Sequence, residues 1–469
     1  ADALINTPGA PVRQALLDAG IGQDVFGGIM EHLRQSGIFI MAKNADARDK
    51  HRFYEIIING FREAAKGIDR KSLEAAINSR EFSYREADYG STPRGLSCGL
   101  DMLQSWIYDD RAAFTYMRGG DVYAELREKL STRFYEELIE KYVLDSVHSV
   151  LLSYEPKPGM TDMLEEKLAS QLSEYKAGLS PEEISGIITA TENLRRYQSA
   201  PSTPEEQSCI PSLKRSDLER ESLPLSNNET DVCGVKTVIH DGFTGGIAYI
   251  TFYFDISELP EKWIPYVGQL GGLLGRMDTA EHGYLDLSNE VRLNVGKMSF
   301  APVNVMKSEA RDKSRLMFSL SLSCFENKVG DALRLSAEII TSTKFKDPKR
   351  LRELIAESRS DMQSRINSRG NSVAASRLIS YFSRHAVINE WLGGISAYDF
   401  LKTLQSGFSS FEDRISDSFA VLASYIFSPE RMLISVSSGD DGMRALEAAL
   451  PEFISKLGDH ASESGILDG

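Results

Sequence analysis

The segment RLMFSLSLSC, residues 315–324, decides the fold because its side chains alternate between two kinds along its length. The apolar positions are Leu316, Phe318, Leu320 and Leu322. The small polar positions between them are Ser319, Ser321 and Ser323. A period of two indicates a half-buried β-strand of the kind found in antiparallel sheets. We therefore predict an antiparallel sheet around this strand.

Helical patterns surround this strand in long runs. We predict helices over residues 263–274 and 284–295 before it, and over 329–341, 348–369, 372–385, 397–404, 411–427 and 443–457 after it. A second strand, RMLISVSS, occupies residues 431–438. Upstream, residues 231–240 and 245–256 flank the turn pair Asp241-Gly242, which favours a β-hairpin. Strands in hairpins and helices in runs indicate the α+β class, with an antiparallel-rich sheet covered by helices.

The same order of elements occurs twice, in residues 36–154 and again in residues 315–436. In the first copy, SGIFIMAKN is a strand that is apolar on both faces, so we expect both faces to be covered. Helices over residues 47–65, 70–87, 93–108 and 122–142 follow, and then a closing strand over 147–154. Two strands and two helices precede the second copy, but only 35 residues precede the first. We therefore expect a truncated first copy within a larger protein of duplicated units.

Residues 160–196, between the two copies, are purely helical in pattern. Within them, Ser180 suits an N-cap, Pro181 the first helical position and Glu183 the reciprocal capping partner. This turn predicts a long helical hairpin, and the Pro- and Ser-rich stretch SAPSTPEEQSCIPS predicts an extended connection after it. We predict three parts, over residues 1–158, 159–204 and 205–469.

Charge and cysteine usage exclude some classes of protein. The formal net charge is −15, whereas nonspecific nucleic-acid binding needs clustered Lys and Arg. No run of about 18 apolar residues occurs, so we expect no membrane span. Four cysteines without a Cys-x-x-Cys pair indicate reduced thiols and a cytoplasmic location, with an organelle matrix as the alternative. They are Cys98, Cys209, Cys233 and Cys324.

Three short motifs resemble catalytic or binding motifs but occur in the wrong context. The first motif matches the Gly-x-Ser-x-Gly nucleophile elbow at Gly95-Leu96-Ser97-Cys98-Gly99, and this elbow needs a strand before the serine. Ser97 instead falls inside a predicted helix, where the small residues favour close helix packing. Ser173 and Lys176 have a nucleophile–lysine spacing but fall on the hairpin. A third group follows a predicted helix rather than a strand, which indicates a helix contact instead of a phosphate loop. It comprises Gly271, Gly272 and Gly275.

The histidines do not form a local metal motif. No two of the seven lie within five positions of each other, so no single helix presents two imidazoles to a zinc ion. They are His32, His51, His148, His240, His282, His385 and His460. We therefore assign no catalytic, cofactor-binding or metal-binding residue in this chain, and the substrate-binding residues stay unknown.

Four segments together resemble one family of proteins. LSPEEISGIITATENLRRYQSAPSTPEEQSCIPSLKRSDLE, residues 179–219, is similar to the helical connector of the presequence protease and falcilysin group, in the insulinase–pitrilysin superfamily of zinc metallopeptidases. SYREADYGSTPRGLSCGLDMLQSWIYD, residues 83–109, resembles its second domain. GYLDLSNEVRLNVGKMSFAP, residues 283–302, resembles a passage of its third domain, although Gly296 is followed by Lys297 where the family usually has a second glycine. The Gly-Ile-Ser-x-Tyr-x-Phe-Leu pattern of residues 394–401 agrees as well.

The resemblance implies a fold and a role. Proteases of this group have four α/β domains in two bowl-shaped halves, which a helical hairpin joins and which close around an unfolded peptide. By resemblance, residues 1–158 are the later part of domain two, 159–204 the hairpin and 205–469 domain three. The zinc-binding His-x-x-Glu-His helix belongs to domain one, so we expect zinc there, no cofactor here and no activity from this chain alone.

The implied partners are unstructured peptides, with basic ones favoured by an acidic wall, and the other domains of the same protease. The implied contribution of this chain is chamber wall, hinge and peptide-docking surface. The alternative is a natural non-catalytic binding or scaffold subunit of the same superfamily. An in-frame His-x-x-Glu-His upstream in the gene would favour the first hypothesis.

Overall fold

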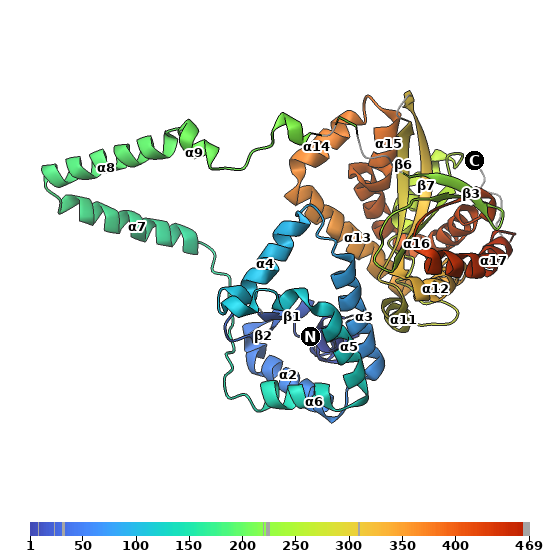
Figure 1. Cartoon of the computed structure of the whole chain (residues 1–469), viewed down its shortest axis with the longest axis horizontal. Coiled ribbons are helices and arrows are strands. Elements are labelled where there is room, and N and C mark those ends of the chain that lie inside the picture. The colour runs from blue at the N-terminus through green and yellow to red at the C-terminus, as the bar shows by residue number, and fades with distance from the viewer. Residues whose placement is uncertain are drawn as a thin grey trace. The chain divides into compact units, whose positions relative to one another are not determined.

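The computed structural model describes residues 1–7, 9–22, 24–30, 33–218, 220–221, 226–307 and 310–462. They divide into two compact units (Figure 1). The main unit comprises Ala1–Ser149 and Ser226–Gly469, and the hairpin unit comprises Val150–Leu225. Among the described helices, none combines the length and the apolar character that a membrane crossing requires. The division of the chain into residues 1–158, 159–204 and 205–469, expected from the sequence, stays a prediction.

A six-stranded sheet organises the C-terminal part of the main unit. Its strands are β3 (Asn228–Val232), β4 (Val235–Ile239), β5 (Ile247–Asp255), β6 (Lys297–Lys307), β7 (Ala310–Phe325) and β8 (Met432–Ser437). Their order is β3-β4-β8-β5-β7-β6, and only β4 and β8 run parallel. The apolar face of β7 is buried as predicted, since Phe318 and Leu320 are fully buried, but the strand is not half-buried, because Ser319 and Ser323 on the opposite face are only 5 and 6% exposed. The α+β class is therefore observed, with an antiparallel-rich sheet.

The predicted hairpin around Asp241-Gly242 is wrong. Strands β4 and β5 do not pair with each other, because β8 lies between them and pairs with both. The hairpin in this region joins β3 to β4 through Cys233 and Gly234, which have φ angles of 55° and 83°. Two positive φ angles in a two-residue loop match the twist of the flanking strands. A local turn signal at residues 241–242 cannot show that a distant strand enters the sheet between its neighbours.

Helices pack on this sheet and on one another (Figure 1). They are α10 (Ile264–Leu270), α11 (Tyr284–Asn294), α12 (Val329–Ser342), α13 (Pro348–Ser368), α14 (Gly370–Ile379), α15 (Arg384–Gly393), α16 (Ile395–Ile426) and α17 (Asp440–Ser462). α12 packs against α17, and α13 packs against α16. Phe427 contacts both Phe254 and Phe318 edge to face, at ring-centroid distances of 5.1 and 5.5 Å. The core therefore joins the helical layer to the centre of the sheet.

Three predicted helices are divided or merged in the structure. The helix expected over 372–385 is split between α14 and α15, because Ser383 adopts extended dihedral angles and caps α15. The two helices expected over 397–404 and 411–427 form the single element α16, which bends at Phe411, where φ is −138°.

The N-terminal part of the main unit contains a small two-stranded sheet. Strand β1 (Asp24–Met30), which the sequence did not predict, pairs antiparallel with β2 (Gly37–Lys43). A separate core of buried residues from α1 (Pro11–Asp18), α2 (Lys50–Lys66) and this sheet lies beneath it. The expectation that both faces of β2 are covered is wrong, because Ile38 is 49% and Met41 48% exposed.

Three helices follow β2 as predicted, and a fourth is broken. The three are α2, α3 (Arg70–Glu86) and α4 (Arg94–Trp106). The helix expected over 122–142 is instead α5 (Gly119–Glu128) and α6 (Phe134–Ile139), with a 3₁₀ turn at Lys129–Ser131 between them. α3 packs against α11, and Phe82 of α3 contacts Phe325 of β7 at a ring-centroid distance of 5.8 Å. This contact connects the two copies of the repeat within the main unit.

The hairpin unit has the two predicted long helices. α7 (Met160–Ala177) and α8 (Pro181–Ser199) meet at a turn from which they diverge (Figure 1). The predicted capping box is confirmed, since Ser180 and Glu183 exchange side-chain to backbone hydrogen bonds at 2.8 and 3.2 Å. The connection after α8, expected to be extended, contains one short helix, α9 (Pro204–Ser208).

Candidate functional site

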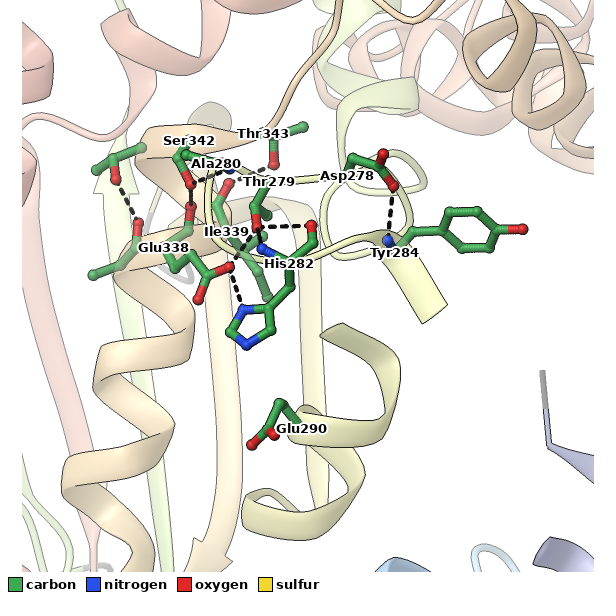
Figure 2. Close-up of polar contacts among 12 residues, drawn as sticks. Asp278, Thr279, Ala280, His282, Tyr284, Glu290, Glu338, Ile339, Ser342 and Thr343 are labelled. Atoms are coloured by element: carbon green, nitrogen blue, oxygen red, sulfur yellow. Dashed lines mark hydrogen bonds and ion pairs between the residues drawn. The ribbon is translucent and has the colours of Figure 1, made fainter. Parts of the chain in front are cut away.

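A buried polar cluster joins the loop before α11 to the last turns of α12 (Figure 2). The loop closes on itself, because the Thr279 amide donates to the His282 carbonyl at 2.8 Å and the His282 amide donates to the Thr279 hydroxyl at 3.0 Å. The Lys344 amide donates to the Asp278 carbonyl at 2.8 Å, which ties the loop to the residues after α12. The loop therefore holds its side chains in place against the helix.

Glu338 of α12 is the centre of this cluster. Its Oε1 atom lies 2.9 Å from Nδ1 of His282 and also accepts the hydroxyl of Thr279 (Figure 2). The side chain of Glu338 is 2% exposed and that of His282 is 25% exposed. Oε2 of Glu338 is buried and has no hydrogen-bond partner among the described residues. An unsatisfied buried carboxylate oxygen is costly, so this atom calls for an explanation.

Glu281, on the exposed side of the loop, completes a three-residue set. One ligand atom from each of Glu281, His282 and Glu338 lies within 4.8 Å of the other two. Imidazole nitrogen and carboxylate oxygen are the donor types that zinc and related divalent cations bind. The search for histidine pairs within one helix missed this set, because its members lie on different elements, 56 residues apart for His282 and Glu338.

The serine motifs lie within helices. Ser97 lies inside α4, so the strand-to-helix turn of a nucleophile elbow is absent at this residue. The expectation that Gly95 and Gly99 allow close helix packing is not met in this chain, since an added Cβ at either position would have no described atom within 4 Å. Ser173 and Lys176 both lie on the exposed helix α7.

The glycines near α10 do serve a helix contact. A Cβ added at Gly268 would lie 2.2 Å from the Leu392 carbonyl oxygen, and one at Gly271 would lie 2.2 Å from the Phe300 carbonyl oxygen. α10 therefore approaches α15 and β6 more closely than a side chain would allow. This geometry agrees with the predicted packing role of Gly271 and leaves no phosphate-binding loop at that residue.

A second feature is apolar surface without a cover in this chain. Residues 147–154, predicted to be a strand, have no paired strand among the described residues, and Val150, Leu152 and Tyr154 are 75, 83 and 102% exposed. The prediction of a formed strand is therefore wrong for this chain. Exposed apolar residues also line α4, α7 and α8. They include Leu96, Leu100, Trp106, Leu164, Leu168, Leu172, Ile187 and Ile188.

Comparisons with known proteins identify the family. The model of the family associated with subfamily C of the M16 peptidases matches residues 154–404, more than half of the chain, so the chain belongs to this family. Protein HypA of Clostridium perfringens is 30% identical over 98% of this chain and 47% of its own length. Presequence protease 1, chloroplastic/mitochondrial, of Arabidopsis thaliana is 27% identical over 98% of this chain and 43% of its own length. The resemblance to presequence proteases is confirmed, and the chain spans about half the length of these relatives or slightly less.

Among solved structures, a peptidase M16 inactive domain from Pseudomonas fluorescens aligns with 52% of this chain and 53% of its own, at 12% identity and a TM-score of 0.34. A score this low adds nothing to the family assignment, which rests on the sequence matches.

Proposed function

We propose that this chain is the non-catalytic portion of a larger zinc endopeptidase that degrades unstructured peptides in a closed chamber. In this role it supplies chamber wall, hinge and peptide-docking surface, and the zinc lies in another part of the same protein. The family membership and the similarity to presequence proteases support this proposal. The observation that carries it is the unpaired segment 147–154.

The second copy of the repeat indicates which partners this segment lacks. Its counterpart there is β8, which lies between β4 and β5 with Ile434 and Val436 almost fully buried. Similarly, β2 is the counterpart of β7, which pairs with β5 as well as β6. In the first copy, no described strand takes the place of β4 or β5. We infer that these strands come from another part of the larger protein.

Adding those strands would stabilise the first copy considerably. Side chains as exposed as Val150 and Leu152 contribute about 1.5–3 kcal/mol each when they become fully buried. Pairing would also remove open strand edges, which otherwise favour aggregation. The same argument applies to the half-exposed side chains of β2.

Hydrogen exchange tests this inference. We expect amides of residues 147–154 to exchange freely in the isolated chain and to become protected when the chain is expressed together with the polypeptide encoded upstream of it. Amides of β8 are the internal control, because they are paired in both forms. If residues 147–154 still exchange freely in the longer protein while β8 is protected, the proposal fails.

The catalytic and substrate parts of the proposal need separate assays. We expect the isolated chain not to cleave an unstructured basic peptide, with or without added zinc, as followed by mass spectrometry, and cleavage would contradict the non-catalytic role. In the longer enzyme, the charge reversals Glu165→Lys and Glu166→Lys on exposed α7 should lower kcat/KM for basic peptides more than for acidic ones. Equal effects on both peptides would contradict an acidic docking wall.

A further inference from the structure

We propose that Glu281, His282 and Glu338 form a binding site for one divalent transition-metal cation, with zinc as the best match. This site is independent of the proposed peptidase zinc, because all of its ligands come from this chain. Its expected role is structural, since it would clamp the loop before α11 onto the end of α12.

The first argument is the state of the buried carboxylate. Glu338 is almost completely buried, and its ion pairs among the described residues include neither lysine nor arginine. Thr279 and His282 both contact Oε1, so Oε2 stays without a partner. Burying a carboxylate costs several kcal/mol unless a counter-charge and hydrogen bonds compensate. A cation bound by this carboxylate supplies the counter-charge, and a carboxylate that binds through both oxygens also satisfies Oε2.

The second argument is the spacing of the ligand atoms. Nδ1 of His282 and Oε1 of Glu338 lie 2.9 Å apart. Two ligand atoms that each lie about 2.0–2.1 Å from a tetrahedral zinc ion are roughly 3.3 Å apart, somewhat more than the hydrogen-bonded spacing here. The cation would therefore take the place of the shared proton, with a small adjustment of the side chains. The carboxylate of Glu281 lies within reach as a third ligand, which leaves a further coordination position for water.

The third argument is that the ligands are held in place before binding. Glu338 lies on α12, whose next residues are fixed by hydroxyl to carbonyl hydrogen bonds, including Ser342 to Glu338 at 2.7 Å. The loop is closed by the hydrogen bonds between Thr279 and His282 (Figure 2). The ligand set selects the class of ion, because calcium and magnesium prefer six or more oxygen ligands and a histidine favours zinc, cobalt or nickel.

Cobalt binding to the whole chain tests the proposal, since Co²⁺ reports its ligands in the visible spectrum. After chelator treatment and desalting, the chain should bind one Co²⁺ that Zn²⁺ displaces, without the intense near-ultraviolet absorption of cobalt–thiolate bonds. That absorption would instead indicate the exposed thiols Cys209 and Cys233. We expect Glu338→Gln and His282→Gln to bind at least tenfold more weakly, and the control Glu357→Gln to bind as the parent chain does.

Glu357 is a matched control because its carboxylate pairs with Arg276 on the surface, outside the cluster. Glu281 is exposed, so the Glu281→Gln variant does not disturb the buried core. If Glu338→Gln fails to fold, weaker cation binding by Glu281→Gln tests the proposal in its place. The proposal is overturned if the parent chain binds no stoichiometric cation, if thiolate absorption accompanies the binding, or if binding is unchanged in both Glu281→Gln and His282→Gln.

Discussion

The contact between α10 and the sheet gives the sharpest prediction, because two adjacent glycines differ in their surroundings. In Gly271→Ala, the new Cβ would lie 2.2 Å from the Phe300 carbonyl oxygen, a backbone atom of β6 that cannot rotate away. In Gly272→Ala, the nearest atoms are the Gln269 carbonyl oxygen at 3.4 Å and the Ser358 hydroxyl at 3.7 Å, which are ordinary contacts. Neither glycine has a positive φ angle, so backbone strain does not separate the two variants.

The expected magnitudes follow from these distances. Overpacking a core costs about 1–3 kcal/mol, whereas replacing glycine by alanine in an accessible conformation stabilises a protein by about 0.4–1 kcal/mol through the unfolded state. We therefore expect Gly271→Ala to destabilise the main unit by about 1–2 kcal/mol net, and Gly272→Ala to leave its stability unchanged or slightly higher.

Urea unfolding followed by tryptophan fluorescence measures this difference, because Trp263 and Trp391 pack against the same core. The Gly272→Ala variant should unfold at the urea midpoint of the parent chain or slightly above it, and Gly271→Ala should unfold at lower urea. Equal midpoints for the two variants would refute the close-packing argument. A loss of phosphate or nucleotide binding in Gly271→Ala would instead favour the phosphate-loop interpretation that the structure disfavours.

Two further predictions concern ionisable groups. The backbone hydrogen bond from Ser180 is the main cause that lowers the pKa of Glu183 below its usual 4.5. The ionised carboxylate therefore stabilises the start of α8 above about pH 4.5, and this stabilisation is lost as the pH falls through the lowered pKa. Hydrogen-exchange protection of this turn should therefore decrease in acid, and Glu183→Gln should remove that pH dependence; an unchanged pH dependence would contradict the capping argument. Burial raises the pKa of the Cys324 thiol to about 12. Cys324 should therefore resist alkylation at about pH 8, whereas Cys209 and Cys233 should react. Peptide mapping by mass spectrometry checks this, and modified Cys324 in the folded chain would contradict its burial.

Patterns of short range predicted most of the helices and strand β7. The Ser180–Glu183 capping box is formed by residues three apart, and the alternation of β7 depends on neighbours within one strand. In contrast, strand β1 was missed, because its sequence, DVFGGIM, contains two adjacent glycines that weaken the strand pattern. The predicted helix over 122–142 was broken for a different reason, since amphipathic spacing does not reveal where tertiary contacts interrupt a helix.

The sequence by itself determined the α+β class, the helical hairpin and the family, because these depend on periodicity, caps and motifs within short stretches. Only the tertiary structure decided the sheet order, in which β8 lies between β4 and β5, and the cluster that joins His282 to Glu338 across 56 residues. Such pairings depend on which distant segments bury each other's apolar surface. Residues 147–154 stay exposed for the same reason, because a strand with a clear local pattern joins a sheet only when its neighbouring strands are present.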